Sequence, residues 1–554
     1  MKRRALGALI CAALIGAGGA GCKRSRAGTE QGANGREEPA PDGLSMRLTL
    51  AADGRSLGVE IRVKGPEAAE VKALRATRGW GGTRPLAAIQ GVEVRDAGGP
   101  IAVGRAADEG AFSVLPLARP ASGGEIVVRY TARADTEVSR LALHRGAGGL
   151  SGVGHGFVLR PALQHEMPLS VTLRAEPGSG AALATTLDGR KAATVEDLAA
   201  AVYVAGPLRS EVLASGDRAT VAFGAAMDAR AALDVAARTA GFAERVFGLD
   251  GRGERERVVL FVIGERGIGR EHDGASTGGA VSVWIDAERT LDDGARILLS
   301  HEALHRVFGG ALRLDAGGRD AAWFSEGFAT HYARRALFDQ GMITAEAFLA
   351  DVARARDGGP EGATDGGAHA LGYGLGSRYA ALLDAEIRGR SGGKRSLDDV
   401  VRALAEIARK APDEPIAMAV FRNTVTAEIG ADRERALWDG LVIGALPELP
   451  DDAFGPCFRR KVEMRTVAAL GFDAASLDAS PQIIRGTVPG SAAERAGVRD
   501  GALVLRSSVR AGQRVDPDVE VELVLAGRKG KQVVRYRPAR TEKVAAFAPQ
   551  PCGR

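Results

Sequence analysis

The stretch ILLSHEALHRVFGG, residues 297–310, places two histidines four positions apart in a leucine-rich, helical context. Four residues make about one turn of an α-helix, so His301 and His305 share one face and both imidazoles can reach a single metal ion. Glu302 lies about 100° further round the helix and points beside that ion. The pattern His-Glu-x-x-His therefore predicts a metal centre with a carboxylate next to it.

A third metal ligand is expected from a neighbouring helix. The sequence AAWFSEGFATHYARRAL, residues 321–337, has helical character and supplies Glu326, 21 residues after His305. That interval allows a helix end at the Gly-Gly pair that closes the first stretch, a polar loop and a return. His331 is the competing ligand. Five residues after Glu326 it lies well round the helix, so we assign it a structural or surface role.

The ligand set indicates a chemistry. His301, His305 and Glu326 suit zinc (Zn2+), which prefers nitrogen and oxygen ligands and keeps a fourth position for water at catalytic sites. Zinc lowers the pKa of such a water, so Glu302 is expected to act as general base and then as general acid in a hydrolysis.

Such a hydrolysis also needs a hydrogen-bond donor for the oxyanion. The predicted donor is Tyr373 in HALGYGLGSRYAALLDAEIR, residues 369–388, with His369 as the second choice. A buried tyrosine in a core helix is the alternative for Tyr373.

The amino-terminal residues have the layout of a secretory signal. Three basic residues at positions 2–4 precede an apolar run from Ala5 to Gly21 that is too short for a membrane span. The residues Gly-Ala-Gly before Cys22 resemble the lipobox of bacterial lipoproteins, which implies lipid attachment at Cys22 in a bacterial cell envelope, at the outer membrane or the periplasmic face. Ordinary secretion is the alternative.

The overall charge argues against nucleic acid as a partner. The chain carries a net charge of +5, and the three basic residues of the signal segment account for +3 of it. The remainder carries 5 − 3 = +2, which is too little for a nucleic-acid footprint.

The patterning predicts an α+β, multidomain chain. After the signal, residues 23–43 contain no aliphatic residue larger than alanine and are expected to form a disordered tether. Alternating apolar residues then predict an antiparallel β-domain, and apolar residues spaced by three and four predict helices from about residue 228. The predicted parts are a signal peptide (1–21), a tether (22–43), a β-rich domain (44–208), a mainly helical domain with one strand region (209–450) and a final β-unit (457–554).

Two of the four cysteines remain in the folded part. Cys457 and Cys552 bracket the last unit, and we predict that they form a disulfide bond, which suits an oxidising compartment. Two unpaired thiols are the alternative.

The residues of the predicted metal centre resemble those of the glycyl aminopeptidase family of gluzincin (HExxH) zinc metallopeptidases. The family's W-x-x-E-G motif is present at residues 323–327, and the segment from Tyr373 to Val400 looks like its Y-x-x-G helix with the LD-x-x-IR and SLDD signatures that follow. The resemblance implies zinc, a thermolysin-like catalytic domain behind a β-rich domain, and Tyr373 as the donor to the transition state.

The same resemblance implies a PDZ domain at the carboxy terminus. Residues 490–498, followed by Asp500 and Gly501, look like the helix-and-turn motif of bacterial PDZ domains, and the segment AlaLeuGlyPhe looks like their carboxylate-binding loop. Its residues Leu470, Gly471 and Phe472 are then expected to bind the carboxy-terminal end of a peptide. A domain kept only for packing is the alternative.

The substrate strand differs from the family pattern. Where the family carries an acidic residue for the substrate's free amine, this chain has Gly-Gly-Ala-Val-Ser at residues 278–282. The alternating segment Val281 to Ile285 is expected to pair with an extended substrate.

Taken together, the residues predict an exported, lipid-anchored zinc metallopeptidase that hydrolyses peptides or unfolded chains, with aminopeptidase action as one mode. The alternative is a non-catalytic, PDZ-containing envelope lipoprotein that binds partners and keeps zinc for structure. The complete motif favours catalysis, because a purely structural site has no need of Glu302.

Overall fold

The computed structural model describes the chain from residue 42 to residue 552. It leaves out the segments 81–82, 135–138, 147, 177–180, 250–256, 269–271, 278–279, 316–320, 357–367, 413, 511–514 and 528–529, and the side chains of 355–356 and 368–371. The predicted signal, the tether and Cys22 lie outside the described residues, as does the His369 side chain. Within the described part, none of the helices is long and apolar enough to span a membrane.

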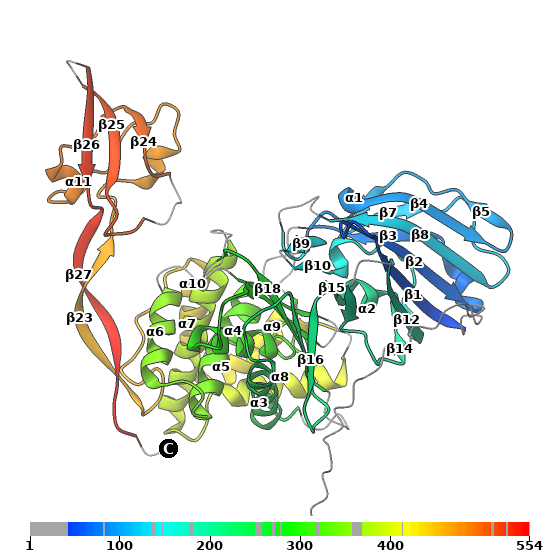
Figure 1. Ribbon diagram of the computed structural model, residues 1–554. Coiled ribbons are helices and arrows are strands. Elements are labelled where there is room, and N and C mark those ends of the chain that lie inside the picture. The colour runs from blue at the N-terminus through cyan, green and yellow to red at the C-terminus, as the bar shows by residue number, and fades with distance from the viewer. Residues whose placement is uncertain are drawn as a thin grey trace, which may run out of the picture. The chain divides into compact units, whose positions relative to one another are not determined.

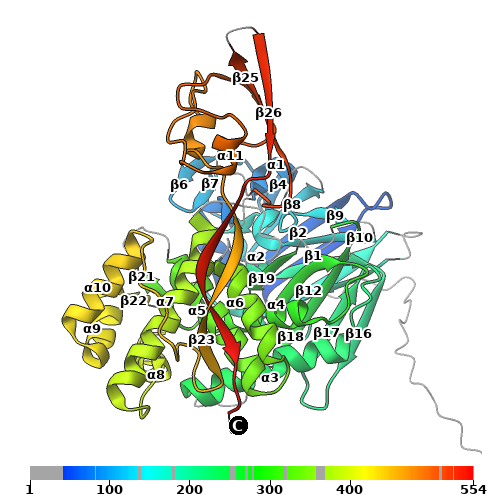
Figure 2. The same cartoon turned by 90° about the vertical axis from the view of Figure 1, so that its left-hand side faces the viewer.

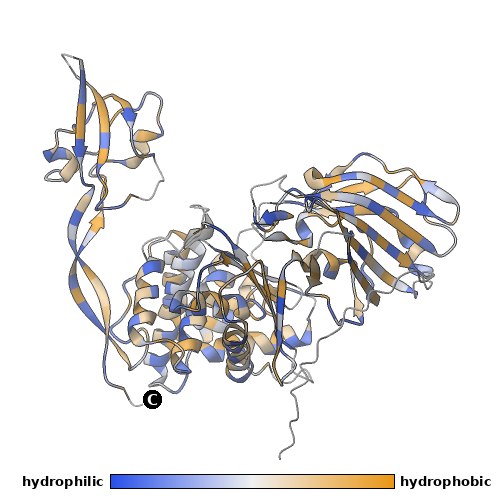
Figure 3. Cartoon of the chain, viewed as in Figure 1, coloured by the Kyte–Doolittle hydropathy of each residue, from blue (hydrophilic) through white to orange (hydrophobic). Residues whose placement is uncertain are grey.

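The first structured region is built around a seven-stranded sheet. Its strands alternate between hydrophobic and hydrophilic residues (Figure 3), which puts Leu44, Met46 and Leu48 into the core. The strand order is β14 (Ala192–Ala193), β12 (Met167–Ala175), β1 (Gly43–Leu50), β2 (Ser56–Lys64), β8 (Glu125–Arg133), β4 (Ile89–Asp96) and β5 (Gly99–Ile101).

The predicted antiparallel pairing is wrong at one place in this sheet. Strands β1 and β12 run parallel, with Leu44 opposite Leu169, whereas every other pair in the described sheet is antiparallel. A parallel pair needs a long crossover, and here most of the region separates the two strands in sequence. Alternation along a strand predicts its buried face but not the direction of its neighbour.

Two four-stranded sheets and two short helices complete this region. One sheet has the order β13 (Ala182–Thr185), β15 (Val202–Gly206), β10 (Gly149–Val153) and β9 (His144–Gly146). The other has the order β11 (Arg160–Pro161), β3 (Ala73–Thr77), β7 (Phe112–Pro116) and β6 (Ala107–Glu109). The helices are α1 (Pro85–Ala88) and α2 (Val195–Ala200).

A five-stranded sheet begins the second region. Its order is β16 (Leu208–Val212), β17 (Arg218–Ala222), β18 (Val259–Glu265), β20 (Ala280–Asp286) and β19 (Asp273–Thr277). The three central strands are parallel and the two outer strands are antiparallel to them. Helices α3 (Ala229–Phe247) and α4 (Asp293–Leu304) pack on one face through Leu233 and Leu299.

The sheet corrects the prediction for the substrate strand. Residues Val281 to Ile285 belong to β20, which is hydrogen-bonded to β18 on one side and to β19 on the other. Both edges of β20 are therefore occupied, and it cannot accept a further strand. Among the described strands, β19 is the edge strand next to β20.

Helices make up the rest of the second region (Figure 1). They are α5 (Ala322–Asp339), α6 (Ala345–Arg356), α7 (Ala368–Ser391), α8 (Leu397–Lys410), α9 (Met418–Ile429) and α10 (Ala431–Val442); the short strand β21 (Leu314–Asp315) precedes α5, and β22 (Ile416–Ala417) lies between α8 and α9 in sequence. Their core is rich in aromatic rings, among them Phe308, Phe324, Phe328 and Tyr332. Large rings that interlock fix the spacing of the helices.

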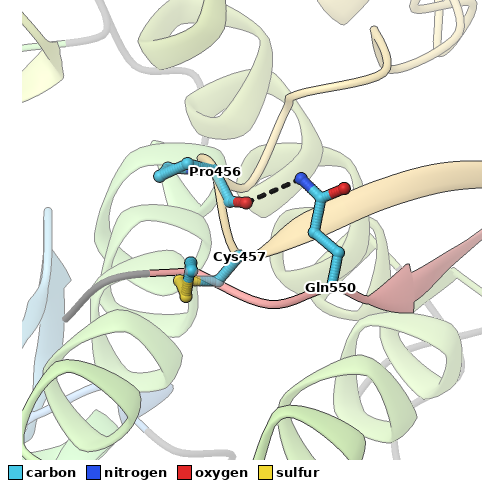
Figure 4. The surroundings of a disulfide bond; sticks show 4 residues. Pro456, Cys457 and Gln550 are labelled. Carbon is cyan, nitrogen blue, oxygen red and sulfur yellow. Dashed lines mark hydrogen bonds between the residues drawn. A yellow bond between two sulfur atoms is a disulfide. The ribbon is translucent and has the colours of Figure 1, made fainter.

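The last region begins with a two-stranded ribbon, seen along its length in Figure 2. Strands β23 (Phe458–Ala468) and β27 (Ala539–Pro549) pair antiparallel over 11 residues each. Cys457 and Cys552, the pair predicted from the sequence, are joined by a disulfide bond with a Cα–Cα distance of 5.0 Å. Beside it, the Gln550 side chain donates a hydrogen bond to the Pro456 carbonyl (Figure 4).

The chain that connects the two ribbon strands forms a small unit with its own core at one end of the ribbon (Figure 1). It contains a three-stranded antiparallel sheet of β24 (Val504–Ser507), β25 (Val521–Gly527) and β26 (Gly530–Tyr536), with the short helix α11 (Ala492–Arg495). Leu523, Val534 and Phe472 are among its buried residues. The unit lies within residues 457–554, the range predicted for the last β-unit.

Candidate metal centre

Helix α4 carries the predicted ligand His301 in its last turn, and the predicted ligand His305 is the residue that follows its end. The helix begins after Asp292, whose side chain caps it by accepting a hydrogen bond from the Ala295 N–H. It ends at Leu304, earlier than the Gly-Gly pair at which the sequence predicted the stop. His301 and Glu302 are 6% and 5% exposed, and the rings of His301 and His305 are 4.6 Å apart.

The carboxylate of Glu326 on α5 meets both imidazoles. Its Oε2 lies 3.1 Å from Nε2 of His301 and 3.3 Å from Nε2 of His305. Three ligands at 2.0–2.1 Å from a tetrahedral zinc ion would be separated by about 3.3 Å. Both carboxylate–imidazole separations therefore fit zinc, and ligand atoms of His301, Glu302 and His305 lie within 4.8 Å of one another.

The other nitrogen of each imidazole, Nδ1, also has a polar partner within hydrogen-bonding distance. Nδ1 of His305 lies 3.2 Å from the Phe308 carbonyl oxygen, to which it can donate a hydrogen bond. Nδ1 of His301 lies 3.2 Å from Oγ1 of Thr330 on α5. A partner at Nδ1 sets the orientation of the ring and leaves Nε2 as the ligand atom.

Thr330 is a residue of the centre that the sequence reasoning missed. It lies four residues after Glu326, and residues with that spacing share one face of a helix. Once Glu326 was assigned as a ligand, this spacing was the signal that could have identified Thr330.

Burial and neighbouring charges shift the pKa of Glu302. Burial raises the pKa of Glu302 to about 7, the negative charges of Glu326 and Asp273 act in the same direction, and His305 opposes them. A carboxyl group with a pKa near neutrality can accept a proton and return it within one reaction cycle. Glu302 is thus suited to act as both base and acid.

The Glu326 carboxylate and the buried His305 imidazole shift each other's pKa. Burial by itself would lower the pKa of His305, but the nearby Glu326 carboxylate outweighs it and raises that pKa to about 9. Burial would raise the pKa of Glu326, but His305 and His301 outweigh it and hold that pKa well below its usual range. The Glu326 carboxylate is therefore negatively charged where it faces the imidazoles, as a ligand of a cation must be.

Helix α7 brings Tyr373 to the centre. Its ring centroid lies 5.4 Å from that of His301, and the tyrosine is partly exposed. His331, the competing ligand, is buried instead among Arg334, Arg335, Asp384 and Asp398, and burial lowers its pKa to about 4. The structural role assigned to His331 agrees with these surroundings.

Strand β19 is the second feature that the sequence reasoning missed. A Cβ atom added to Gly274 would overlap the carboxyl group of Glu302, so the strand runs directly beside the predicted general base. Asp273, the residue before Gly274, accepts a hydrogen bond of 2.8 Å from the guanidinium of Arg140, which is 133 residues away in sequence. Residues 278–279, part of the stretch that lacks the family's acidic residue, lie outside the described residues.

The predicted peptide-binding loop lies in the last unit. Gly471 has a φ of 79°, Phe472 is 7% exposed and packs in the core, and Tyr536 donates a hydrogen bond to the Leu470 carbonyl at 2.8 Å. The chain continues into a 3₁₀ helix, Ala474–Leu477. Binding of a peptide end by Leu470, Gly471 and Phe472 stays a prediction.

Comparison with known proteins shows what this fold resembles. No family model and no curated protein matches the sequence. The structure is similar to that of an aminopeptidase N family protein from Idiomarina loihiensis, with a TM-score of 0.60, 14% identity, and coverage of 92% of this chain and 98% of that one. This likeness shows that the chain has the same fold over nearly its whole length, and it confirms a mixed α/β multidomain architecture.

Two other solved structures are less similar. They are an M1 zinc metallopeptidase from Deinococcus radiodurans, with a TM-score of 0.46, 19% identity and coverage of 74% of this chain and 96% of that one, and yeast LTA4 hydrolase, with a TM-score of 0.44, 12% identity and coverage of 74% and 68%.

Proposed function

We propose that this protein is a zinc-dependent peptidase. The observation that carries the proposal is the convergence of three side chains from two helices, with Oε2 of Glu326 at 3.1 Å and 3.3 Å from the two imidazole Nε2 atoms. Glu302 lies beside them with a pKa near neutrality, a feature that a structural zinc site does not need. The fold shared with an aminopeptidase N family protein agrees with this function.

The residues of the centre divide the work of hydrolysis. His301, His305 and Glu326 would hold zinc. As a Lewis acid, the ion would polarise the scissile carbonyl and lower the pKa of a bound water. Glu302 accepts the proton of the attacking water and then delivers it to the leaving amine. The Tyr373 hydroxyl donates a hydrogen bond to the oxyanion of the tetrahedral intermediate.

Strand β19 is the proposed docking strand for the substrate. Its described residues pair with β20 alone, and its Gly274 lies against Glu302. An extended peptide added to the outer edge of β19 would pass beside the general base, as in other recognition by strand addition. This assignment replaces the one made from the sequence, which used Val281 to Ile285.

Asp273 is the acidic residue that the structure places on this strand near Glu302. Its partner Arg140 already balances part of its charge. Free and amino-terminally acetylated peptides of the same sequence test whether the substrate's amine is recognised. A preference for free peptides that is lost in Asp273→Asn identifies Asp273 as the amine anchor, and equal cleavage of both peptides in the wild type identifies an endopeptidase.

The proposed location is the cell envelope. The signal layout and Cys22 support export and lipid attachment, and the disulfide between Cys457 and Cys552 suits an oxidising compartment. Labelling of the expressed protein with a fatty acid, compared with a Cys22→Ser variant, tests the anchor.

We also propose that the last unit recruits peptide ends through the loop at Leu470.

The enzymatic proposal is tested by zinc content and peptide hydrolysis. Glu302→Gln is expected to retain zinc and lose hydrolysis, whereas Glu326→Gln is expected to lose zinc. Glu406→Gln is the matched control, because this glutamate is 59% exposed on α8 and should behave as the wild type. Equal turnover by the wild type and Glu302→Gln would exclude the mechanism. If none of the four proteins hydrolyses peptides while all except Glu326→Gln bind zinc, the result would favour the binding lipoprotein.

A further inference from the structure

Helices α5 and α7 touch backbone to backbone beside the metal centre. A Cβ atom added to Gly376 of α7 would lie 2.8 Å from Cα of Trp323 and would overlap its carbonyl oxygen. A Cβ atom added to Gly327 of α5 would lie 2.8 Å from the Ser377 nitrogen and would overlap the backbone of Gly376. Distances below 3.0 Å between such atoms require the backbone to shift, so neither position accepts even alanine without movement.

Gly372 extends the same contact by one turn of α7. Its added Cβ would lie 2.9 Å from Cβ of Ala322. Gly372 and Gly376 are four residues apart, and that spacing puts both on the face of α7 that meets α5. We call Gly327, Gly372 and Gly376 the glycine seam.

Backbone conformation does not explain these glycines. None of the three has a positive φ, and all lie inside helices, where glycine is less stable than alanine by about 1 kcal/mol. Gly389, on the same helix α7, has no atom within 4 Å of its added Cβ. The seam residues are therefore distinguished by the space they leave for the other helix.

The seam lies next to the reacting groups. Glu326 immediately precedes Gly327 on α5, and Tyr373 lies between the two seam glycines of α7. Helix α5 is also attached to α4 through Thr330 and His301, and Oγ of Ser300 donates a hydrogen bond to the Ala333 carbonyl. A side chain inserted at the seam would therefore separate α7, which carries Tyr373, from α5, which is attached to α4 at the metal centre.

We infer that the glycine seam sets the distance of Tyr373 from the metal centre, and that its residues act as positioning residues for the reaction. This inference rests on the proposed function. A methyl group at the seam would move the backbones apart by on the order of 1 Å, a misplacement that can lower a catalytic rate by about 100-fold.

The first test compares Gly376→Ala with the control Gly389→Ala in the full-length protein. Gly376→Ala is expected to lower kcat by about 10- to 100-fold with zinc content and KM unchanged, whereas Gly389→Ala keeps the wild-type kcat. The same substitution is then made in a Tyr373→Phe background. There Gly376→Ala is expected to cost little further activity, because its effect passes through the Tyr373 hydroxyl. An equal loss in both backgrounds overturns the inference.

A size exchange provides the test if Gly376→Ala fails to fold. Gly372→Ala is expected to lower kcat, and the second substitution Ala322→Gly, which removes the opposing Cβ, is expected to restore part of it. Unchanged kcat in Gly372→Ala, or no recovery in the pair, overturns the inference.

A crystal structure of the variant that folds separates this inference from the proposed function. If α7 is displaced from α5 while Glu326 remains next to both histidines, the structure supports the inference that the glycine seam positions Tyr373. This holds even if the wild type hydrolyses no peptide. In that case only the proposed function fails. An unchanged position of Tyr373 overturns the seam whatever the activity.

Discussion

Oγ1 of Thr330 lies 3.2 Å from Nδ1 of His301, one helical turn beyond the proposed ligand Glu326. The hydroxyl therefore orients the imidazole from the side opposite to the metal position. Partners of this kind affect metal affinity because they fix the ring and its tautomer.

Thr330→Val keeps the shape of the side chain and removes its hydroxyl. We expect zinc affinity to fall by about 10- to 100-fold, measured by competition with a chelator of known affinity. Thr424→Val on α9 is the control, since its hydroxyl bonds only the Val420 carbonyl among the described residues. Equal zinc affinity in Thr330→Val and the wild type would show that the hydroxyl has no part in the centre.

Gly274→Ala tests the contact between strand β19 and Glu302, the proposed general base. The new methyl group would overlap the Glu302 carboxyl group and displace it. We expect kcat to fall by about 10- to 100-fold with zinc content retained. Gly58→Ala in β2 is the control, because its added Cβ meets other atoms only at 3.7 Å. Wild-type kinetics in Gly274→Ala would place Glu302 elsewhere.

Because the pKa of His155 is lowered in the folded protein, we expect the free energy of unfolding to fall in acid. Burial, with the charge of Arg160 in the same direction, lowers the pKa of His155 to about 4, from 6.5 in the unfolded chain. The unfolded chain binds the additional proton first, so the stabilisation is complete above about pH 6.5 and is lost progressively as the pH falls to about 4. The shift corresponds to roughly 3 kcal/mol.

The matching variant is His155→Asn, which cannot titrate but keeps a polar atom near Oγ1 of Thr77, the partner of Nδ1 at 2.9 Å. Its melting temperature is expected to fall less between pH 7 and about pH 4.5 than that of the wild type. His165→Asn, at a histidine that is 55% exposed, should follow the wild-type curve. The same acid loss in all three proteins would contradict the assignment.

The disulfide bond predicts a stability difference confined to the last region. It closes a loop between residues separated by 95 positions, for which the chain-entropy model gives about 4.7 kcal/mol. The double variant Cys457→Ser, Cys552→Ser is expected to lose its carboxy-terminal ribbon to protease at a lower temperature. Peptide hydrolysis should persist at low temperature, because the metal centre lies on α4, α5 and α7. Equal protease resistance with and without the bond would contradict this expectation.

Local patterns were sufficient for much of the metal centre. His301, Glu302 and His305 lie within two turns of one chain segment, so the helical period alone places them together. Glu326 was predicted because the chain between the two helices is short and contains a glycine stop. The capped start of α4 and the alternation of β1 likewise follow from neighbouring residues.

Other features depend on residues that are distant in sequence. The sequence did not reveal that β19, and not β20, ends the sheet, because strand order is set by which faces are buried against other elements. The Arg140 to Asp273 pair joins segments 133 residues apart, and the parallel pairing of β1 with β12 is equally remote.

By itself, the sequence determined which side chains can hold a metal and which one can move a proton, because those assignments need only the period of a helix and the chemistry of the ligands. The tertiary structure alone decided what surrounds them: the strand beside Glu302, the hydroxyl behind His301 and the glycine contact that brings Tyr373 into range. The reason is physical. A periodic pattern defines the face of an element, but close packing between elements decides which faces meet and at what distance.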